Sequence, residues 1–175
     1  PDPLDKLTNL VGLFLDDNHL SGTLPRSLSK LKKIQRLVLQ NNQLEGPLME
    51  SLFSLQNLTD LRLNGNSLNG TIPSEVSNSS SLKVLHLNQN KLTGSLPRHF
   101  PRMLVDLALQ NNALRGSIGF LKRSSVHLSR VNLGENLLEG GLPSSSIKDM
   151  PKLRVLDLQG NHRVSWGCSM NSVKF

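Results

Sequence analysis

The sequence contains very few aromatic residues and only one cysteine, and both shortages limit what the protein can be. Aromatic residues make up 3% of its 175 residues, with one Trp and no Tyr, so its core must be built from aliphatic side chains. Because Cys168 is the only cysteine, no disulfide can form within the chain, and motifs that need paired cysteines are excluded. We expect Cys168 to be a buried or capping thiol.

Long apolar runs are also missing. No segment approaches the roughly 18 consecutive apolar residues that a membrane-spanning helix needs. The first ten residues, PDPLDKLTNL, lack the basic and apolar regions of a signal peptide. The sequence therefore predicts no transmembrane segment in this chain, and its length is that of one domain with its own core.

The chain is basic, with 20 Lys and Arg against 13 Asp and Glu and a formal net charge of +7. Such an excess favours acidic partners in general. A nucleic-acid-binding protein usually clusters its basic residues and adds aromatic side chains that stack on bases. Here the basic residues are scattered and aromatic residues are scarce, so we expect no nucleic-acid binding.

What the sequence has in abundance is leucine at regular spacing. The segments LFLDDNHLSGTLP, LRLNGNSLNGTIP and LHLNQNKLTGSLP, which begin at Leu13, Leu61 and Leu85, share Leu, Asn, Gly and Pro at the same offsets. An internal repeat of this length indicates a solenoid. With the asparagine as marker, seven units follow at intervals of 24, 24, 24, 22, 24 and 25 residues: Asn18, Asn42, Asn66, Asn90, Asn112, Asn136 and Asn161.

Each part of the unit has a structural consequence. Alternating Leu-x-Leu predicts a short strand with one buried face. The asparagine amide can both donate to and accept from backbone groups that would otherwise lack partners, so stacked asparagines should form a ladder. The glycine four residues after the marker permits a tight turn, and the proline that often follows favours an extended arm. One coil cannot bury its leucines alone, so the coils must stack.

The unit resembles the plant-type leucine-rich repeat, Leu-x-x-Leu-x-Leu-x-x-Asn-x-Leu-x-Gly-x-Ile/Leu-Pro, and SGTLP, NGTIP and TGSLP match the arm that distinguishes this subtype. The resemblance implies an α/β solenoid. This would be a right-handed horseshoe with a concave parallel sheet of about seven short strands and irregular or 3₁₀ segments on the convex side. The chain is similar to the ectodomains of plant receptor-like kinases and receptor-like proteins, and to polygalacturonase inhibitors, whose repeats recognise other molecules.

The two ends differ from the middle of the chain. Pro1, Leu4, Leu7 and Leu10 have the spacing of a second half-repeat, so we expect a solenoid over residues 1–161 that begins mid-repeat with upstream sequence missing. Residues 162–175 leave the leucine frame and are expected to form a C-terminal cap or tail. Val164 or Trp166 would close the last coil there.

No pattern for catalysis or metal binding is present. The five histidines have no second His, Cys or Asp at metal-ligand spacing. No Gly-x-Ser-x-Gly segment occurs. There is no glycine-rich loop for binding phosphate either, because every Gly-Asn and Gly-Glu pair belongs to the repeat frame. We therefore expect no enzyme activity, no cofactor and no metal.

Three N-glycosylation sequons begin at Asn57, Asn69 and Asn78. They are either true acceptor sites or by-products of a repeat rich in Asn, Ser and Thr. The sequons and the family resemblance favour a secreted or cell-surface location, whereas the single unpaired cysteine argues against an oxidising compartment. The compartment therefore stays open.

The outward positions of the predicted strands are the best candidates for binding a protein or peptide partner. They carry Arg and one aromatic residue, the side chains that most often anchor protein interfaces. The candidate partner-binding residues are Phe14, Asp16, Arg36, Val38, Asp60, Arg62, His86 and Arg130.

Two other functions fit the sequence less well. The chain could be an accessory subunit of a larger assembly or a longer chain, held through basic residues outside the sheet, such as Lys30, Lys32, Lys33, Arg98 and Arg102. Ice binding, known in a few members of the family, needs a regular array of Thr or Asn. The corresponding positions are uneven: Thr23, Pro47, Thr71, Ser95, Ser117 and Gly141.

Overall fold

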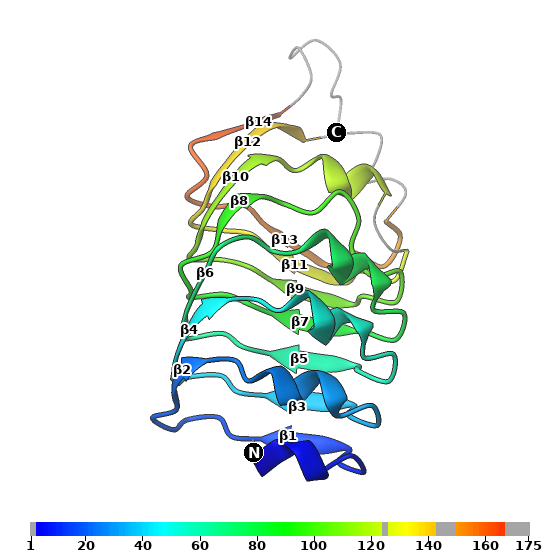
Figure 1. The fold of residues 1–175 in the computed structure, drawn as a ribbon. Helices are drawn as coiled ribbons and strands as arrows, with labels where there is room; N and C mark the ends of the chain where they lie inside the picture. The colour runs from blue at the N-terminus through cyan, green and yellow to red at the C-terminus, as the bar shows by residue number, and fades with distance from the viewer. Residues whose placement is uncertain (1–2, 124–125, 143–149, 167–175) are drawn as a thin grey trace.

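A computed structural model, which describes residues 3–123, 126–142 and 150–166, shows the chain wound into stacked coils (Figure 1). Each coil places one three-residue strand in a parallel sheet, and the strands follow one another in chain order. The predicted concave sheet is confirmed, with seven strands: β1 (Gly12–Phe14), β3 (Arg36–Val38), β5 (Asp60–Arg62), β7 (Val84–His86), β9 (Asp106–Ala108), β11 (Arg130–Asn132) and β13 (Val155–Asp157).

The arms that follow the asparagines form two further parallel sheets, which the sequence did not predict. The repeat indicated only extended arms, and the structure pairs them because each arm runs beside the arm of the preceding coil. Ser21, Gly22 and Thr23 of one arm, for example, pair in parallel with Gln43, Leu44 and Glu45 of the next. One sheet contains β2 (Ser21–Thr23), β4 (Gln43–Pro47) and β6 (Ser67–Asn69), and the other contains β8 (Thr93–Ser95), β10 (Ala113–Ser117), β12 (Leu137–Leu142) and β14 (Arg163–Trp166).

Short 3₁₀ helices complete most coils on the convex side, as the resemblance implied. Pro25 and Pro73 are extended, with φ of −72° and −62°, and a helix follows each of them. The coil two residues shorter than the rest, residues 91–112, is described throughout and contains no such helix. The 3₁₀ helices are η1 (Pro3–Lys6), η2 (Arg26–Lys30), η3 (Glu50–Ser54), η4 (Ser74–Asn78) and η5 (Gly119–Arg123).

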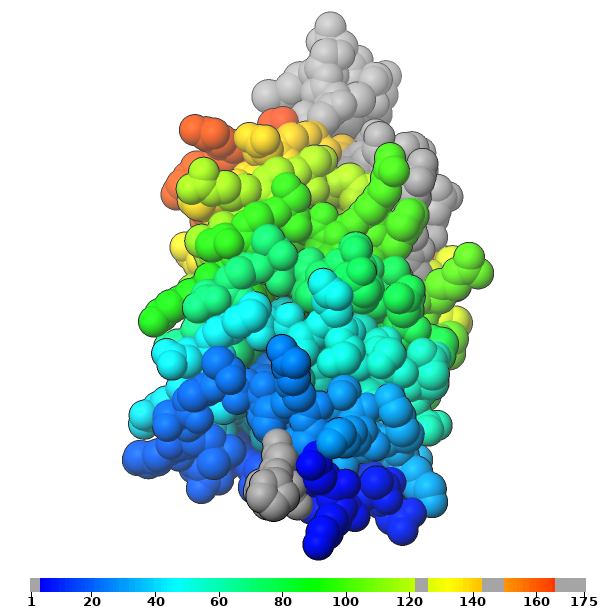
Figure 2. Space-filling view, viewed as in Figure 1, coloured from blue at the N-terminus to red at the C-terminus, as the bar shows by residue number. Residues whose placement is uncertain are grey.

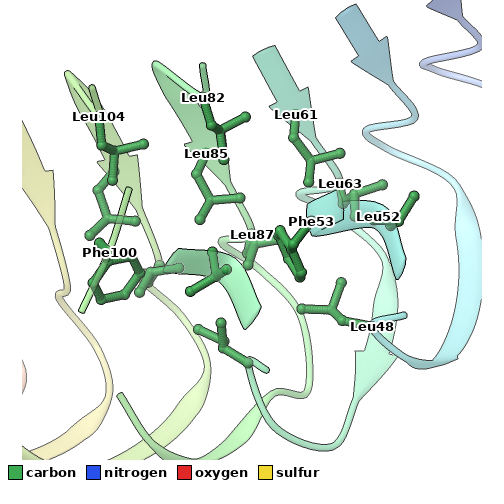
Figure 3. Close-up of a cluster of buried hydrophobic side chains, with 14 of the residues drawn as sticks. Leu48, Leu52, Phe53, Leu61, Leu63, Leu82, Leu85, Leu87, Phe100 and Leu104 are labelled. Atoms are coloured by element: carbon green, nitrogen blue, oxygen red, sulfur yellow. The ribbon is translucent and has the colours of Figure 1, made fainter. Parts of the chain in front are cut away.

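The core lies between the concave sheet and the convex helices, and leucine fills most of it (Figure 3). Leu61, Leu63 and their equivalents on the next coils are fully buried. Phe53 and Phe100 fill the space on the helical side, and the ring of Phe100 lies 4.9 Å from that of Phe120. Each coil thus buries its leucines against the neighbouring coils. The coils form successive bands in Figure 2.

The marker asparagines form the predicted ladder between coils. Asn66 Oδ1 accepts a hydrogen bond from Leu44 N at 2.9 Å, and Asn66 Nδ2 donates to Leu39 O and Leu63 O. The same bonds recur at the next markers, down to Asn161. Asn18 is exposed and bonds only within its own coil.

Two positions in each coil need left-handed backbone. The repeat glycine has φ between 73° and 95°, as the tight turn requires, and it also leaves room for the arm of the preceding coil. A Cβ on Gly94 would lie 2.7 Å from Thr71 Cγ2. The residue before each marker is left-handed as well, at φ of 50° to 69°, which the sequence did not predict: Asp17, Asn41, Gly65, Gln89, Asn111, Glu135 and Gly160.

The repeat frame ends at Asn161, but β14 pairs with β12 beyond it. Val164, which was expected to close the last coil, packs against the core from this strand. The boundary between solenoid and cap at residue 161 stays a prediction. Cys168 lies outside the described residues.

Candidate recognition surface

The outward side chains of the concave sheet lie in two straight rows, in the register expected from the repeat. The seven-strand sheet aligns Gly12, Arg36 and Asp60 in one row, and Phe14, Val38 and Arg62 in the other. A row of buried leucine-type side chains separates them. The first row continues through Val84, Asp106, Arg130 and Val155, and the second through His86, Ala108, Asn132 and Asp157.

Phe14 and Arg36 form one end of this surface. The Phe14 ring lies over Gly12, since a Cβ on Gly12 would come within 2.7 Å of the ring atom Cε2. The guanidinium carbon of Arg36, on the neighbouring strand, lies 5.0 Å from the ring centre, within the range of a cation–π interaction. Phe14 remains 52% exposed. This end therefore offers an aromatic face beside a positive charge.

Val38, another candidate, is largely buried. It was named as a candidate partner-binding residue, and it is 7% exposed. In its row it lies between Phe14 and Arg62, which have larger side chains. Asp16, another candidate, is partly buried where the chain leaves β1.

The centre of the surface carries a pair of opposite charges from one strand. Arg62 Nε donates to both carboxylate oxygens of Asp60, at 3.0 and 3.3 Å. This hydrogen bond raises the pKa of the Arg62 guanidinium above its ordinary value, against the opposing effect of partial burial. Both residues were predicted from the sequence, but their pairing within one strand was not.

Asp106 joins two predicted residues and was not itself among the predicted binding residues. Its Oδ2 accepts hydrogen bonds from Arg130 Nη2 at 2.8 Å and from Arg130 Nε at 3.1 Å, across β9 and β11. His86 Nε2, on the other neighbouring strand, lies 3.4 Å from the same oxygen. The position of Asp106 in the outward row, beside two basic residues, is the signal that could have identified it.

Three side-chain atoms near the centre are buried and lack a hydrogen bond. They are Asn64 Oδ1, His86 Nε2 and Gln110 Oε1. The distance from His86 Nε2 to Asp106 is short enough for an ion pair, but the geometry does not form a hydrogen bond. An unsatisfied buried polar atom costs free energy.

The other candidate residues lie outside the concave sheet. Asn57, Asn69 and Asn78 are exposed, and Asn57 Nδ2 donates to Lys32 O at 2.8 Å. Whether they carry glycans stays a prediction. Two of the flanking lysines are engaged with the first coil: Lys30 pairs with Asp5 at 2.7 Å, and Lys33 Nζ donates to Asn9 Oδ1.

The part of the chain that the structure describes holds no group of three or more His, Cys, Asp or Glu side chains arranged to bind a metal. Within the same residues, none of the helices has the length and apolar character needed to cross a bilayer.

Comparison with known proteins identifies the family. The Leucine Rich Repeat family model matches residues 9–31, 57–79 and 81–103. Together with the stacked coils, the asparagine ladder and the Gly-x-Leu-Pro arms, this match decides the assignment. The chain is built of plant-type leucine-rich repeats. A search among curated proteins found no match.

Solved structures of plant leucine-rich-repeat proteins share the fold. The PEPR1–AtPEP1 structure is 34% identical over 91% of this chain, with a TM-score of 0.83. The ectodomain of the Arabidopsis receptor kinase HAESA, in complex with an extended IDA peptide hormone, is 29% identical over 90% of this chain, with a TM-score of 0.82. A plant ice-binding protein is 26% identical over 91%, with a TM-score of 0.68.

This leucine-rich-repeat chain is much shorter than the two receptor structures. It covers 26% of the PEPR1 chain and 27% of the HAESA chain, and 59% of the ice-binding protein. The similarity therefore concerns one stretch of repeats within those longer receptors.

Proposed function

We propose that this chain is a non-catalytic recognition module that binds a protein or peptide partner on its concave sheet. The observation that carries the proposal is the pair of aligned outward rows. They combine an exposed aromatic ring, three arginines and paired charges on one surface. Arginine and aromatic side chains on a fixed frame are the usual anchors of protein interfaces.

The similar structures support a recognition function. The HAESA structure contains a peptide hormone, and a further receptor, the Arabidopsis ectodomain of GASSHO1/SCHENGEN3, was solved in complex with CASPARIAN STRIP INTEGRITY FACTOR 2. These proteins bind their ligands through leucine-rich-repeat ectodomains. This chain has the same fold over most of its length, so we infer a ligand of the same general kind, a peptide or protein segment.

The concave charges favour a partner with both polar and apolar groups. Arg62 and Arg130 are already paired with carboxylates, so a partner has to match these pairs rather than neutralise free charges. At the other end, Phe14 offers a flat apolar contact.

The test begins with affinity purification of a partner from the native source, followed by binding measurements on single variants. We expect Phe14→Ala and Arg62→Ala each to weaken binding by about tenfold or more, as for aromatic and arginine anchors of an interface. Salt should have a mild effect, because most concave charges are internally paired.

The basic flank supplies the matched control. Replacing Lys30, Lys32 and Lys33 together by Gln should leave the affinity for a concave partner unchanged. The reverse result, with strong salt dependence and loss only in the lysine variant, would instead support the accessory subunit held through its flank. Equal binding by the wild type and all variants would overturn both proposals.

A further inference from the structure

The segments just before the concave strands form a lateral band along one side of the solenoid. Backbone hydrogen bonds hold the band in register: Val105 N donates to Lys83 O, Ser129 N to Val105 O and Arg154 N to Ser129 O, each at 2.8 Å. Equivalent positions on successive coils can therefore be compared directly. The band consists of residues 8–11, 32–35, 56–59, 80–83, 102–105, 126–129 and 151–154.

Apolar side chains are exposed on this band in two neighbouring inner coils. Met103 is 40% exposed, Val105 37% and Val126 56%. Both coils have neighbours on either side, so the exposure is not an effect of the solenoid end. On the three preceding coils, the positions of Met103 and Val105 hold only polar residues: Lys33 and Gln35, Asn57 and Thr59, Ser81 and Lys83.

The same part of the band is basic and hollowed. Val105, His127, Ser129, Pro151, Lys152 and Arg154 line a shallow hollow of about 340 Å³. Lys152 Nζ lies 3.5 Å from His127 Nδ1, on the preceding coil. The seven segments of the band contain six Lys and Arg residues and no Asp or Glu. Apolar surface and positive charge therefore meet at this hollow.

We propose that this lateral hollow is a second interaction surface, which docks an acidic segment of another protein. Carboxylates of that segment face Lys152 and Arg154, and its apolar side chains cover Met103, Val105 and Val126. Exposed apolar side chains that gather beside charged residues mark interaction sites. Because the band carries basic residues and no acidic ones, a partner of complementary charge is acidic.

The composition of the patch favours a protein segment over a nucleic acid. Nucleic-acid grooves combine basic residues with aromatic side chains on which bases stack. The exposed apolar residues of this patch are Met and Val, and the segments of the band contain no Phe, Tyr or Trp. Exposed Met and Val suit the aliphatic side chains of a peptide instead.

The experiment is an NMR titration of the full chain, labelled at its Met and Val methyl groups, with a synthetic peptide that alternates glutamate and leucine. We expect the methyl signals of Met103, Val105 and Val126 to shift, and those of Met49 and Val84, which lie elsewhere, to stay in place. A peptide of alternating glutamate and serine should bind more weakly, since it lacks the apolar contact. A peptide of alternating lysine and leucine should not bind.

The repeat itself supplies substitutions that the fold accepts. Val105→Thr, Lys152→Asn and Arg154→Gln introduce the residues found at the same positions as Thr59, Asn57 and Gln35. The triple variant should lose about tenfold or more in affinity, as for the central residues of an interface. Lys33→Gln with Lys83→Gln, the matched control on other coils, should change the affinity by less than about twofold.

Three results would overturn the proposal. Equal losses in the triple variant and the lysine control would show that charge alone attracts the peptide. Equal binding of the serine peptide would show that the apolar contact adds nothing to the affinity. Displacement of the peptide by a duplex oligonucleotide would favour nucleic acid as the partner. Phe14→Ala tests the concave surface separately and should leave this titration unchanged.

Discussion

The side-chain amide of Asn66 binds the backbone of the preceding coil, accepting a hydrogen bond from Leu44 N at 2.9 Å. The same amide donates to carbonyls of both coils, at Leu39 O and Leu63 O. Such a bond satisfies backbone groups that have no strand or helix partner at this turn. The asparagines are therefore a structural link from coil to coil.

Asn66→Ala should lower the free energy of unfolding by about 2–4 kcal/mol, because it leaves buried backbone donors and acceptors without partners. Asn18 is the matched control, since it is exposed and bonds only within its coil. Asn18→Ala should cost less than about 1 kcal/mol. Urea unfolding followed by circular dichroism measures both, and equal costs would contradict a ladder function for Asn66.

A buried leucine and an exposed leucine at the same position of the repeat can be compared in the same way. Leu63 is fully buried, whereas Leu15, at the same position of the first coil, is 38% exposed. We expect Leu63→Ala to cost about 2–5 kcal/mol, as for other buried leucines, and Leu15→Ala about 1 kcal/mol or less. The midpoint of urea unfolding reports the difference. A Leu15 variant as unstable as the Leu63 variant would show that the first coil is covered.

Gly94→Ala should destabilise the fold through two separate effects. The left-handed φ of 75° costs about 1–2 kcal/mol for a residue with a Cβ, and the new methyl group would meet Thr71 Cγ2 at 2.7 Å. Gly22→Ala has the first effect alone, because nothing lies within 4 Å of its Cβ position. Gly94→Ala should therefore be the less stable variant.

A double variant separates these two effects. Thr71→Ala removes the methyl group that Gly94→Ala meets, so the double variant should recover the difference between Gly94→Ala and Gly22→Ala. The three unfolding midpoints provide this test. If the double variant is no more stable than Gly94→Ala, the contact with Thr71 does not cause the additional loss of stability.

The charge pairs of the concave sheet should contribute little to stability. Arg130 is largely exposed, and its bond to Asp106 is a surface ion pair. We expect Arg62→Ala and Arg130→Ala each to change the free energy of unfolding by less than about 1 kcal/mol. Thermal unfolding with and without added salt checks this. A larger loss would show that these residues are kept for the fold, which would weaken their assignment to partner binding.

The sequence alone predicted the parts of this molecule that depend on the repeat period. In a solenoid a residue lies beside the equivalent residue one coil away, so an offset of about 24 positions becomes a contact in space. That relation was enough to identify buried residues such as Leu63, the asparagine ladder and the two outward rows. The regular interval between the markers thus determined the concave sheet and its register.

The tertiary structure alone decided features that depend on how unlike side chains from neighbouring coils meet. Asp106 became the shared partner of His86 and Arg130 because side chains of different lengths converge on one carboxylate. Val38, although it is at an outward position of its strand, is only 7% exposed. The exposure of Val105 beside Lys152 likewise depends on what the adjacent coils leave uncovered. A repeat period specifies which positions are neighbours, but the sizes and directions of the side chains there determine which atoms touch and which stay open to a partner.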